Sequence, residues 1–547
     1  KMDFLGLKNL TTIHEACTLI QRNHGIDIDP EKLPIDDTAT FELLARGDTV
    51  GVFQLESGGM RDTLRQVGPD CIEDIIAILA LYRPGPMQFI PTYTKRKHGL
   101  EKVEYDHPLL EDILKETNGI IVYQEQIQQA AQKLAGFSLG QGDILRRAMG
   151  KKKPEEMERQ RASFIEGCRK TSKLPPRKAE KIFDNIAKFA GYGFNKSHSA
   201  GYGLIAYHTA YLKAHFPEEF MAALISSEIG KPDKMTVFIN EARDMGLDIL
   251  PPDINVSEPR FLPQPGLIRF GLAGIKTIGE QAAEAVCSER KAGGPFRSLA
   301  DFCLRLDSRL VNRKGIESLI RCGAMDGLGL HRARLLAGLD LCLARAASTQ
   351  RDRQAGQGNL FDDPAAAEWG TAADDLPDCA PWPESEQLAA EKELLGVYMS
   401  GHPLTQHEPA LKRYRLASIA ALGELEPGAL TRVGGLVVRV DKKFTRDKKE
   451  AMAVIQIEDL EGSVEAVVYP SVYQDYQSVL AVGAPVLACA QVKKDEAVSL
   501  KILEIYPLDE APRWFTEQLS LHLPAARVQP ALLQAVKQLL QAHPGPV

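Results

Sequence analysis

The spacing of hydrophobic residues divides the chain into a long helical part and a shorter part rich in strands. From about residue 37 to residue 250, apolar side chains recur mostly at helical spacing, and Gly and Pro interrupt the pattern. From about Thr431 to Leu508, apolar and polar residues alternate with the period of two that is typical of half-buried strands. The pattern therefore predicts helical domains followed by a β domain.

Local signals place several elements in the helical part. A helix is predicted over residues 11–22, and residues 119–126 (GIIVYQEQ) indicate a short buried strand that enters the next helix. The RPGP sequence at residues 83–86 predicts a rigid non-helical turn, because Pro fixes φ and Gly follows it. Pro154, which two acids follow, marks the first turn of another helix.

The strand-rich part fits a five-stranded barrel of the OB type. The predicted strands are residues 433–440, 453–457, 464–469, 485–492 and 499–505, with a helical stretch at 473–480 before the fourth. Lys442, Lys443 and Phe444 are expected in the loop after the first strand, where basic and aromatic groups suit single-stranded nucleic acid. A strand at 519–523 and a helix at 530–542 then indicate the start of a further domain.

A basic run stands out in the helical part, at residues 145–153 (LRRAMGKKK). It contains five cations and no acid, although the whole chain has a net charge of −7: Arg146, Arg147, Lys151, Lys152 and Lys153. Two adjacent arginines suit a polyphosphate, since a guanidinium presents a planar fork of donors to phosphate oxygens. A solvated basic face is the alternative interpretation.

A glycine- and aromatic-rich loop follows at residues 189–203 (FAGYGFNKSHSAGYG). Its glycines permit close approach of the backbone, its aromatic rings offer stacking faces, and Lys196 and His198 offer donors. Ser197 or Ser199 is expected to cap the helix that continues beyond the loop. Phosphate binding at that helix N-terminus and ordinary tight packing both remain open.

Residues 272–279 (LAGIKTIG) and the helix after them resemble a helix-hairpin-helix. In such a unit a glycine hairpin directs backbone N–H groups at a DNA phosphate, so Gly274, Lys276 and Gly279 are candidate DNA contacts. A weaker second copy is expected at residues 312–329, and a plain helical hairpin is the alternative. The polar segment 345–390 then reads as a linker. Its embedded QGNLF sequence, residues 357–361, suits a short peptide that docks on a partner.

Composition limits the class of protein. With 547 residues and 44% hydrophobic content, the chain is long enough for three or four ordinary globular domains. It contains no apolar run near the ~20 residues that cross a bilayer, and no signal-peptide pattern. Its nine cysteines form no Cys-x-x-Cys pair, which favours reduced thiols in a cytoplasmic protein. The first residue is Lys1, so we expect a piece of a longer protein.

Seven motifs together resemble the alpha subunit of bacterial replicative DNA polymerase III. They are KMDFLGL (1–7), VFQLES (52–57), RPGP (83–86), YQEQ (123–126), the basic run, the 191–199 loop and ELLGVYMSGHP (393–403). The resemblance implies a multidomain α+β protein. Its expected parts are the end of the palm (1–10), fingers (11–250), a tandem helix-hairpin-helix region (251–345), a linker with the docking peptide (346–390), connecting helices (391–430), the OB-fold (431–508) and the start of a C-terminal domain (509–547).

The resemblance also implies site residues for a DNA-directed DNA polymerase that uses Mg²⁺. Nucleotidyl transfer employs carboxylates that hold two metal ions roughly 3.5–4 Å apart. Asp3 corresponds to one of those carboxylates, and Lys1 to a palm lysine beside it. Arg146 and Arg147 correspond to fingers residues that contact the β- and γ-phosphates of the incoming nucleotide. Lys151, Asn195, Lys196 and His198 are expected near the nucleotide or the template.

Partners are implied by the same resemblance. They are primer–template DNA, a dNTP, the sliding clamp (beta subunit) through Gln357, Leu360 and Phe361, and the clamp-loader tau subunit; the proofreading exonuclease subunit would bind an N-terminal region outside this sequence, and no membrane is involved. Two alternatives stay open. One is the error-prone paralogue of the same family. The other is a DNA- and clamp-binding fragment without catalysis, since the resemblance leaves two of the three metal-binding carboxylates outside this sequence.

Overall fold

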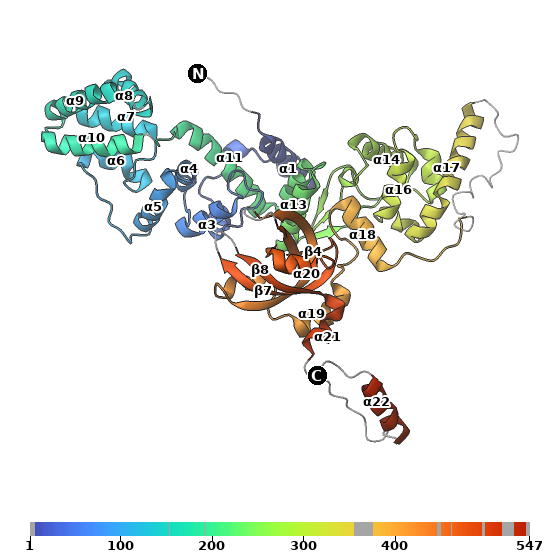
Figure 1. Ribbon diagram of the computed structural model, residues 1–547. Coiled ribbons are helices and arrows are strands. Elements are labelled where there is room, and N and C mark those ends of the chain that lie inside the picture. The colour runs from blue at the N-terminus through green and yellow to red at the C-terminus, as the bar shows by residue number, and fades with distance from the viewer. Residues whose placement is uncertain are drawn as a thin grey trace. The chain divides into compact units, whose positions relative to one another are not determined.

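The computed structural model describes residues 6–151, 154–190, 192–354, 376–445, 450–460, 462–494, 498–516 and 530–542. The chain forms two compact units, Lys1–Met399 and Ser400–Val547. The first unit is mainly helical and the second is built on a β-barrel (Figure 1). The predicted change from helical to strand periodicity is therefore confirmed, as is the multidomain α+β class.

The first part of the helical unit contains thirteen α-helices within the residues that the structure describes. They are α1 (Lys8–His24), α2 (Thr38–Arg46), α3 (Gly58–Val67), α4 (Ile72–Leu81), α5 (Ile90–Lys97), α6 (Glu111–Leu114), α7 (Gln124–Ala135), α8 (Leu139–Lys151), α9 (Pro154–Thr171), α10 (Pro176–Ala190), α11 (Lys196–His215), α12 (Pro217–Ser227) and α13 (Pro232–Asp244). Helix α11 packs against α1, α2, α4 and α12, while α7–α10 pack on one another as a separate lobe (Figure 1). Buried Phe164 and Phe183 lie in the core of that lobe.

The remainder of this unit combines a small sheet with helical hairpins. Strand β3 (Leu267–Arg269) pairs in parallel with β1 (Asp248–Leu250) and antiparallel with β2 (Leu262–Gln264). The helices are α14 (Glu280–Gly293), α15 (Leu299–Arg305), α16 (Arg313–Arg321), α17 (Arg332–Gln354) and α18 (Glu384–Leu395). Their apolar residues share one core with α1, α12 and α13, so this region is packed continuously with the preceding helices.

The second unit confirms the predicted OB-type barrel. Strands β4 (Leu430–Phe444), β5 (Ala451–Glu458), β6 (Ser463–Val468), β7 (Pro485–Lys494) and β8 (Val498–Pro507) close in the order β4-β5-β6-β8-β7. Helix α20 (Pro470–Tyr476) stands between the third and fourth strands, and β6 and β8 pair in parallel. Helices α19 (Glu408–Tyr414), α21 (Ala511–Phe515) and α22 (Pro530–Ala542) complete the described part of the unit.

Several local predictions need correction. Lys442, Lys443 and Phe444 belong to strand β4 and not to a loop, because β4 and β5 continue pairing beyond the residues that face the barrel core. Residues 119–123 contain a single bridge, Tyr123 to Phe194, in place of a strand, whereas the helix expected after them begins at Gln124 as α7. Residues 346–354, expected in the linker, continue helix α17, as the Ala-rich sequence favours.

Other expectations fall outside the described residues. These are Asp3 and Lys1, the docking peptide with Gln357, Leu360 and Phe361, and the strand at 519–523. The helix predicted at 530–542 is present as α22, and α9 begins at Pro154 as expected. In the parts of the chain that the structure describes, each helix is too short or too polar to cross a membrane.

Candidate functional site

Segments that lie far apart in the sequence meet at the junction of the α7–α10 lobe with α4 and α11. They are residues 83–86, 122–124, 143–147 and 192–198, which we call the four-segment cluster. Four of the seven motifs that we identified in the sequence contribute to this cluster. The four-segment cluster is therefore the candidate functional site.

Both arginines of the basic run lie on α8 and share one carboxylate. Arg146 donates to Asp143 through Nε at 3.0 Å and through Nη2 at 2.8 Å. The Nη2 of Arg147 lies 2.8 Å from the other oxygen of Asp143. Hydrogen bonds from Arg146, aided by the charges of both arginines, hold the pKa of Asp143 below its usual value. An acid just before the basic run therefore pairs with both of its arginines, and the composition of the run itself does not reveal this acid.

Gln124 joins the arginine pair to the glycine loop. Its Oε1 accepts from Arg146 Nη1 at 3.1 Å, while its Nε2 donates to the Gly193 carbonyl at 3.0 Å. The backbones of the two segments also pair, since Gln124 N donates to Phe194 O at 2.8 Å and Phe194 N donates to Val122 O at 3.0 Å. The amide of Gln124 therefore fixes the orientation of one guanidinium and the position of the loop together.

The RPGP turn braces the other side of this loop. Arg83 donates through Nε to the Ala80 carbonyl at 2.8 Å and through Nη2 to the Tyr192 carbonyl, and its guanidinium carbon lies 4.5 Å from the centroid of the Phe194 ring. Burial lowers the pKa of Arg83. Gly85 has a φ of +101° and lies so close to the Tyr192 ring that an added Cβ would be 2.6 Å from Cε1. The turn therefore requires glycine.

The remaining loop residues begin helix α11. Asn195 is the N-cap, and its side chain accepts from His198 N at 2.9 Å. The expected cap at Ser197 or Ser199 is wrong, because both serines lie inside α11, and Ser199 is buried and donates to the Ile76 carbonyl at 2.7 Å. The exposed His198 ring packs against the Tyr202 ring, with centroids 4.4 Å apart and the ring planes tilted by 31°.

Lys196 faces a different cavity. Its ammonium lies 2.6 Å from Glu116 Oε2, and its backbone N–H donates to Glu125 at 2.9 Å. Both acids line a cavity of about 750 Å³ together with Lys196, and neither arginine of α8 is part of that lining. The side chain of Lys151 is not described, although the residue itself ends α8. Of the candidate nucleotide-binding residues, Arg146, Arg147, Asn195 and His198 thus belong to the four-segment cluster, whereas the Lys196 side chain lies at the other cavity.

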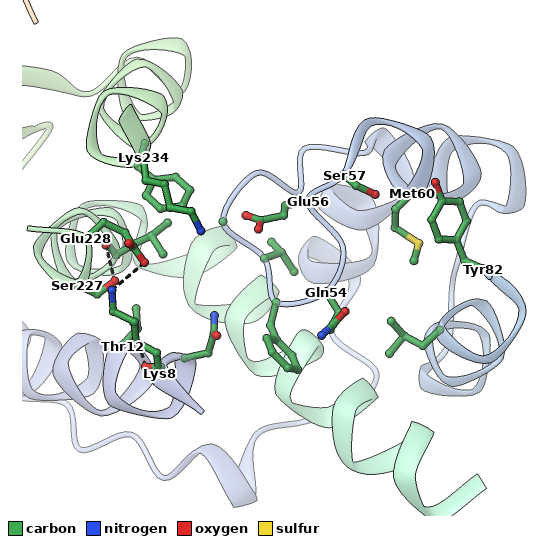
Figure 2. A pocket seen from close by; sticks show the side chains of 17 residues that line it. Lys8, Thr12, Gln54, Glu56, Ser57, Met60, Tyr82, Ser227, Glu228 and Lys234 are labelled. Atoms are coloured by element: carbon green, nitrogen blue, oxygen red, sulfur yellow. Dashed lines mark hydrogen bonds and ion pairs between the residues drawn. The ribbon is translucent and has the colours of Figure 1, made fainter. Parts of the chain in front are cut away.

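A second cavity, of about 490 Å³, lies between α1, the 51–57 segment, and helices α12 and α13. On its α1 wall, Lys8 Nζ lies 2.8 Å from Glu228 Oε1. Figure 2 shows the side chains of Gln54, Glu56 and Lys234 directed into the same space. Gln54 has a φ of +62°, which is unusual for a residue other than glycine. The VFQLES motif of the sequence therefore forms a wall of this cavity.

The first hairpin region uses its candidate DNA contacts in different ways. Gly274 packs against Phe270, and the backbone N–H of Lys276 donates to the Leu394 carbonyl at 2.9 Å. The Lys276 side chain is exposed, and Gly279 is an exposed N-cap of α14 with open space around it. Only the side chain of Lys276 and the surroundings of Gly279 thus remain free to meet a phosphate. In the other unit, Phe444 at the end of β4 is 68% exposed.

Comparison with known proteins explains why these motifs occur together. The model of the bacterial DNA polymerase III alpha subunit finger domain matches residues 9–172, and a helix-hairpin-helix model matches residues 246–335. A DNA polymerase III subunit alpha of Thermus aquaticus is 43% identical over 559 residues, which cover 100% of this chain. The chain belongs to the family of bacterial DNA polymerase III alpha subunits. The resemblance noted from the motifs is thus confirmed.

Other members of the family align equally far along the chain. The DNA polymerase III subunit alpha of Escherichia coli K12 is 39% identical over 565 residues, covering 99% of this chain, and that of Caulobacter vibrioides is 41% identical over 548 residues, covering 100%. The alignments cover 44%, 48% and 47% of the Thermus, Escherichia and Caulobacter proteins. The chain therefore spans about half the length of the curated relatives it matches.

Proposed function

We propose that this chain is part of a replicative DNA-directed DNA polymerase, in which the four-segment cluster binds the triphosphate of the incoming nucleotide. The observation that carries the proposal is the bond between Gln124 and Arg146, because it orients a guanidinium before any ligand arrives. Family membership supports the reaction class, and the names of the relatives favour the replicative subunit over the error-prone paralogue.

The chemistry of the cluster supports phosphate as the ligand. Two guanidiniums on one helix turn supply donors in planar forks, and their charge would stabilise negative charge that moves onto the leaving pyrophosphate. Asp143 now occupies part of each fork. A triphosphate would compete with that carboxylate, so we expect the arginines to exchange partners when the nucleotide binds. His198 and Asn195 border the same loop and would lie near the nucleotide or template.

Mg²⁺ would be held by carboxylates of the palm, and we propose Asp3 as one ligand, with Lys1 facing the triphosphate. Both residues precede the described part of the chain. Within the described residues, the one group with the spacing of a metal site is Asp70, Cys71 and Asp74. It does not fit Mg²⁺, since the Lys97 ammonium lies 2.6 Å from Asp70 and 2.7 Å from Asp74, and a thiol is not a ligand that Mg²⁺ prefers. When bound at the palm, the ions would activate the primer hydroxyl and neutralise the phosphates.

The other modules extend the proposal to DNA and protein partners. We propose that Lys276 and the N-terminus of α14 contact duplex phosphate, and that Lys442, Lys443 and Phe444 contact single-stranded template. Gln357, Leu360 and Phe361 would bind the sliding clamp, and residues 509–547 would begin a domain for the clamp-loader subunit. The domain boundaries given from the sequence are part of this proposal.

The test uses the full-length polymerase that contains this sequence, in steady-state primer extension with varied dNTP. Arg146→Ala removes one charge-assisted contact, of about 1.5–3 kcal/mol, so we expect kcat/KM for dNTP to fall about 10- to 150-fold, with KM raised. The matched control is Arg161→Ala on α9, whose guanidinium pairs with Glu180 and Asp184 in the same lobe. Equal kinetics for the two variants, with unchanged thermal unfolding, would refute the phosphate role of Arg146.

A further inference from the structure

Lys213 is a buried cation on α11 to which the proposed reaction assigns no role. It lies on α11 with 1% of its side chain exposed. Its ammonium donates to the carbonyls of Asp48 and Val50 at 2.8 and 2.9 Å and lies 2.5 Å from Glu241 Oε1. Burying a charge is costly unless every bond is satisfied, so a lysine here needs a reason beyond packing.

The carbonyls that Lys213 binds belong to the 48–55 turn, which leads into the cavity of Figure 2. Thr209, one helical turn before Lys213, accepts from the backbone N–H of Phe53 at 3.1 Å. Within the turn, Thr49 Oγ1 donates to the Leu55 carbonyl at 2.6 Å. Two polar side chains of α11 therefore bind the backbone of this turn, one near residues 48–50 and the other at Phe53.

These hydrogen bonds flank Gln54 and fix its left-handed backbone conformation, with a φ of +62°. A left-handed conformation costs a non-glycine residue on the order of 1 kcal/mol, and it persists only where the surroundings determine it. Gly51, at a φ of +79°, makes the same turn possible, since an added Cβ would be 2.3 Å from a methyl carbon of Leu224. Gln54 itself is exposed to the cavity, and its side chain makes no hydrogen bond with the described residues.

We infer that Lys213 is a positioning residue for the proposed polymerase reaction. Its ammonium holds the 48–55 turn so that the Gln54 amide faces the nucleotide or nucleic-acid substrate in the cavity. An amide carries donors and an acceptor, the same complement that base edges present. The inference rests on the proposed function for the identity of the substrate, whereas the mechanical link between Lys213 and Gln54 is a property of the fold.

The first experiment tests the role of the Gln54 side chain at its left-handed backbone position. In the full-length polymerase, Gln54→Gly removes the backbone strain and the side-chain amide together. The unfolding temperature should therefore stay equal or rise, while KM for dNTP or for primer–template rises about five- to tenfold. The matched control is Lys173→Gly, because Lys173 also has a positive φ, of 53°, but is exposed away from either cavity. The control should leave activity unchanged, and an unchanged KM in Gln54→Gly would overturn the inference.

The second experiment tests Lys213 itself. Replacing both members of the buried pair, Lys213→Met with Glu241→Met, keeps the site filled but releases the two carbonyls. We expect amide hydrogen exchange at residues 52–55 to become at least about tenfold faster without a matching loss of global stability. We also expect Gln54→Ala to raise the same KM in the parent polymerase. In the variant that carries both Lys213→Met and Glu241→Met (the double-Met background), Gln54→Ala should raise KM by less than about twofold, because both changes act through one turn.

The outcomes distinguish the inference from the function on which it rests. Unchanged exchange at residues 52–55, or an undiminished effect of Gln54→Ala in the double-Met background, overturns the role of Lys213. Loss of nucleotide incorporation from the parent polymerase under all conditions overturns the proposed function instead. In that case the exchange measurement still decides whether Lys213 holds the turn.

Discussion

The sharpest test of the four-segment cluster is Gly85→Ala. The substitution adds one methyl group where φ is +101°, a conformation that side chains rarely adopt, at a cost of about 1–3 kcal/mol. The added Cβ would also lie 2.6 and 2.8 Å from Cε1 and Cδ1 of Tyr192. Since carbon atoms in contact stay about 3.5–4.0 Å apart, the ring or the turn must move by about 1 Å.

That movement should be transmitted to the arginine pair. Tyr192 is held through its carbonyl by Arg83, and the residues after it bind Gln124, which in turn orients Arg146. Displacements of about 1 Å at reacting groups can cost on the order of 100-fold in rate. We therefore expect kcat/KM for dNTP to fall about 10- to 100-fold in primer extension by the full-length enzyme.

The control is Gly99→Ala. Gly99 has a φ of +70° and nothing within 4 Å of an added Cβ, so it carries backbone strain without displacing a neighbour. Both variants should unfold at lower temperature, but Gly99→Ala should keep nearly full activity. If the two variants lose activity equally, or if Gly85→Ala loses stability alone, the turn does not position the cluster and our reasoning is wrong.

Further predictions concern two acids. Asp143→Asn frees both α8 arginines, so KM for dNTP should fall about twofold at low ionic strength, and less in high salt; a raised KM would mean that Asp143 orients the guanidiniums instead of competing for them. The hydrogen bond from Lys97 lowers the pKa of Asp70, so this carboxylate stabilises the fold above its unfolded pKa of about 3.9, and the contribution is lost as pH falls below that value. Asp70→Asn should therefore lower the unfolding temperature at pH 6 but not near pH 2. An equal decrease at both pH values would contradict a lowered pKa of Asp70 in the folded protein.

The barrel was predictable because its pattern is local. Alternation in segments such as 463–468 (SVEAVV) identifies a strand by itself, and five such strands with one helical interruption before the fourth fit the OB topology. The exact ends were not predictable. Strand β4 continues to Phe444 because β5 pairs with it, and that partner lies in another segment.

The candidate site was predictable only in part, because several of its contacts, like the end of β4, depend on partners in other segments of the chain. Adjacent arginines signal phosphate by themselves, whereas the roles of Gln124 and Arg83 depend on partners 22 to 109 residues away. Asp143 is an exception, since it precedes Arg146 and Arg147 by three and four residues, and helical spacing alone indicates the pairing. The cap at Asn195 also carried a local signal, but Ser197 and Ser199 offer the same signal, and the residue at which α11 begins decides among the three.

These contacts also explain why the motifs must occur together. Gln124 accepts from Arg146 only if Gly193 passes close by, and an added Cβ at Gly193 would lie 3.2 Å from Gln124 Cγ. Gly193 stays close only if Arg83 and Gly85 hold Tyr192. A change at any one of these positions therefore perturbs the same guanidinium, so their effects on nucleotide use should be strongly non-additive, unlike those of changes at distant, independent sites. Double-mutant cycles between Gln124→Ala and Gly85→Ala measure that coupling directly, and simple additivity would show that the cluster does not act as one unit.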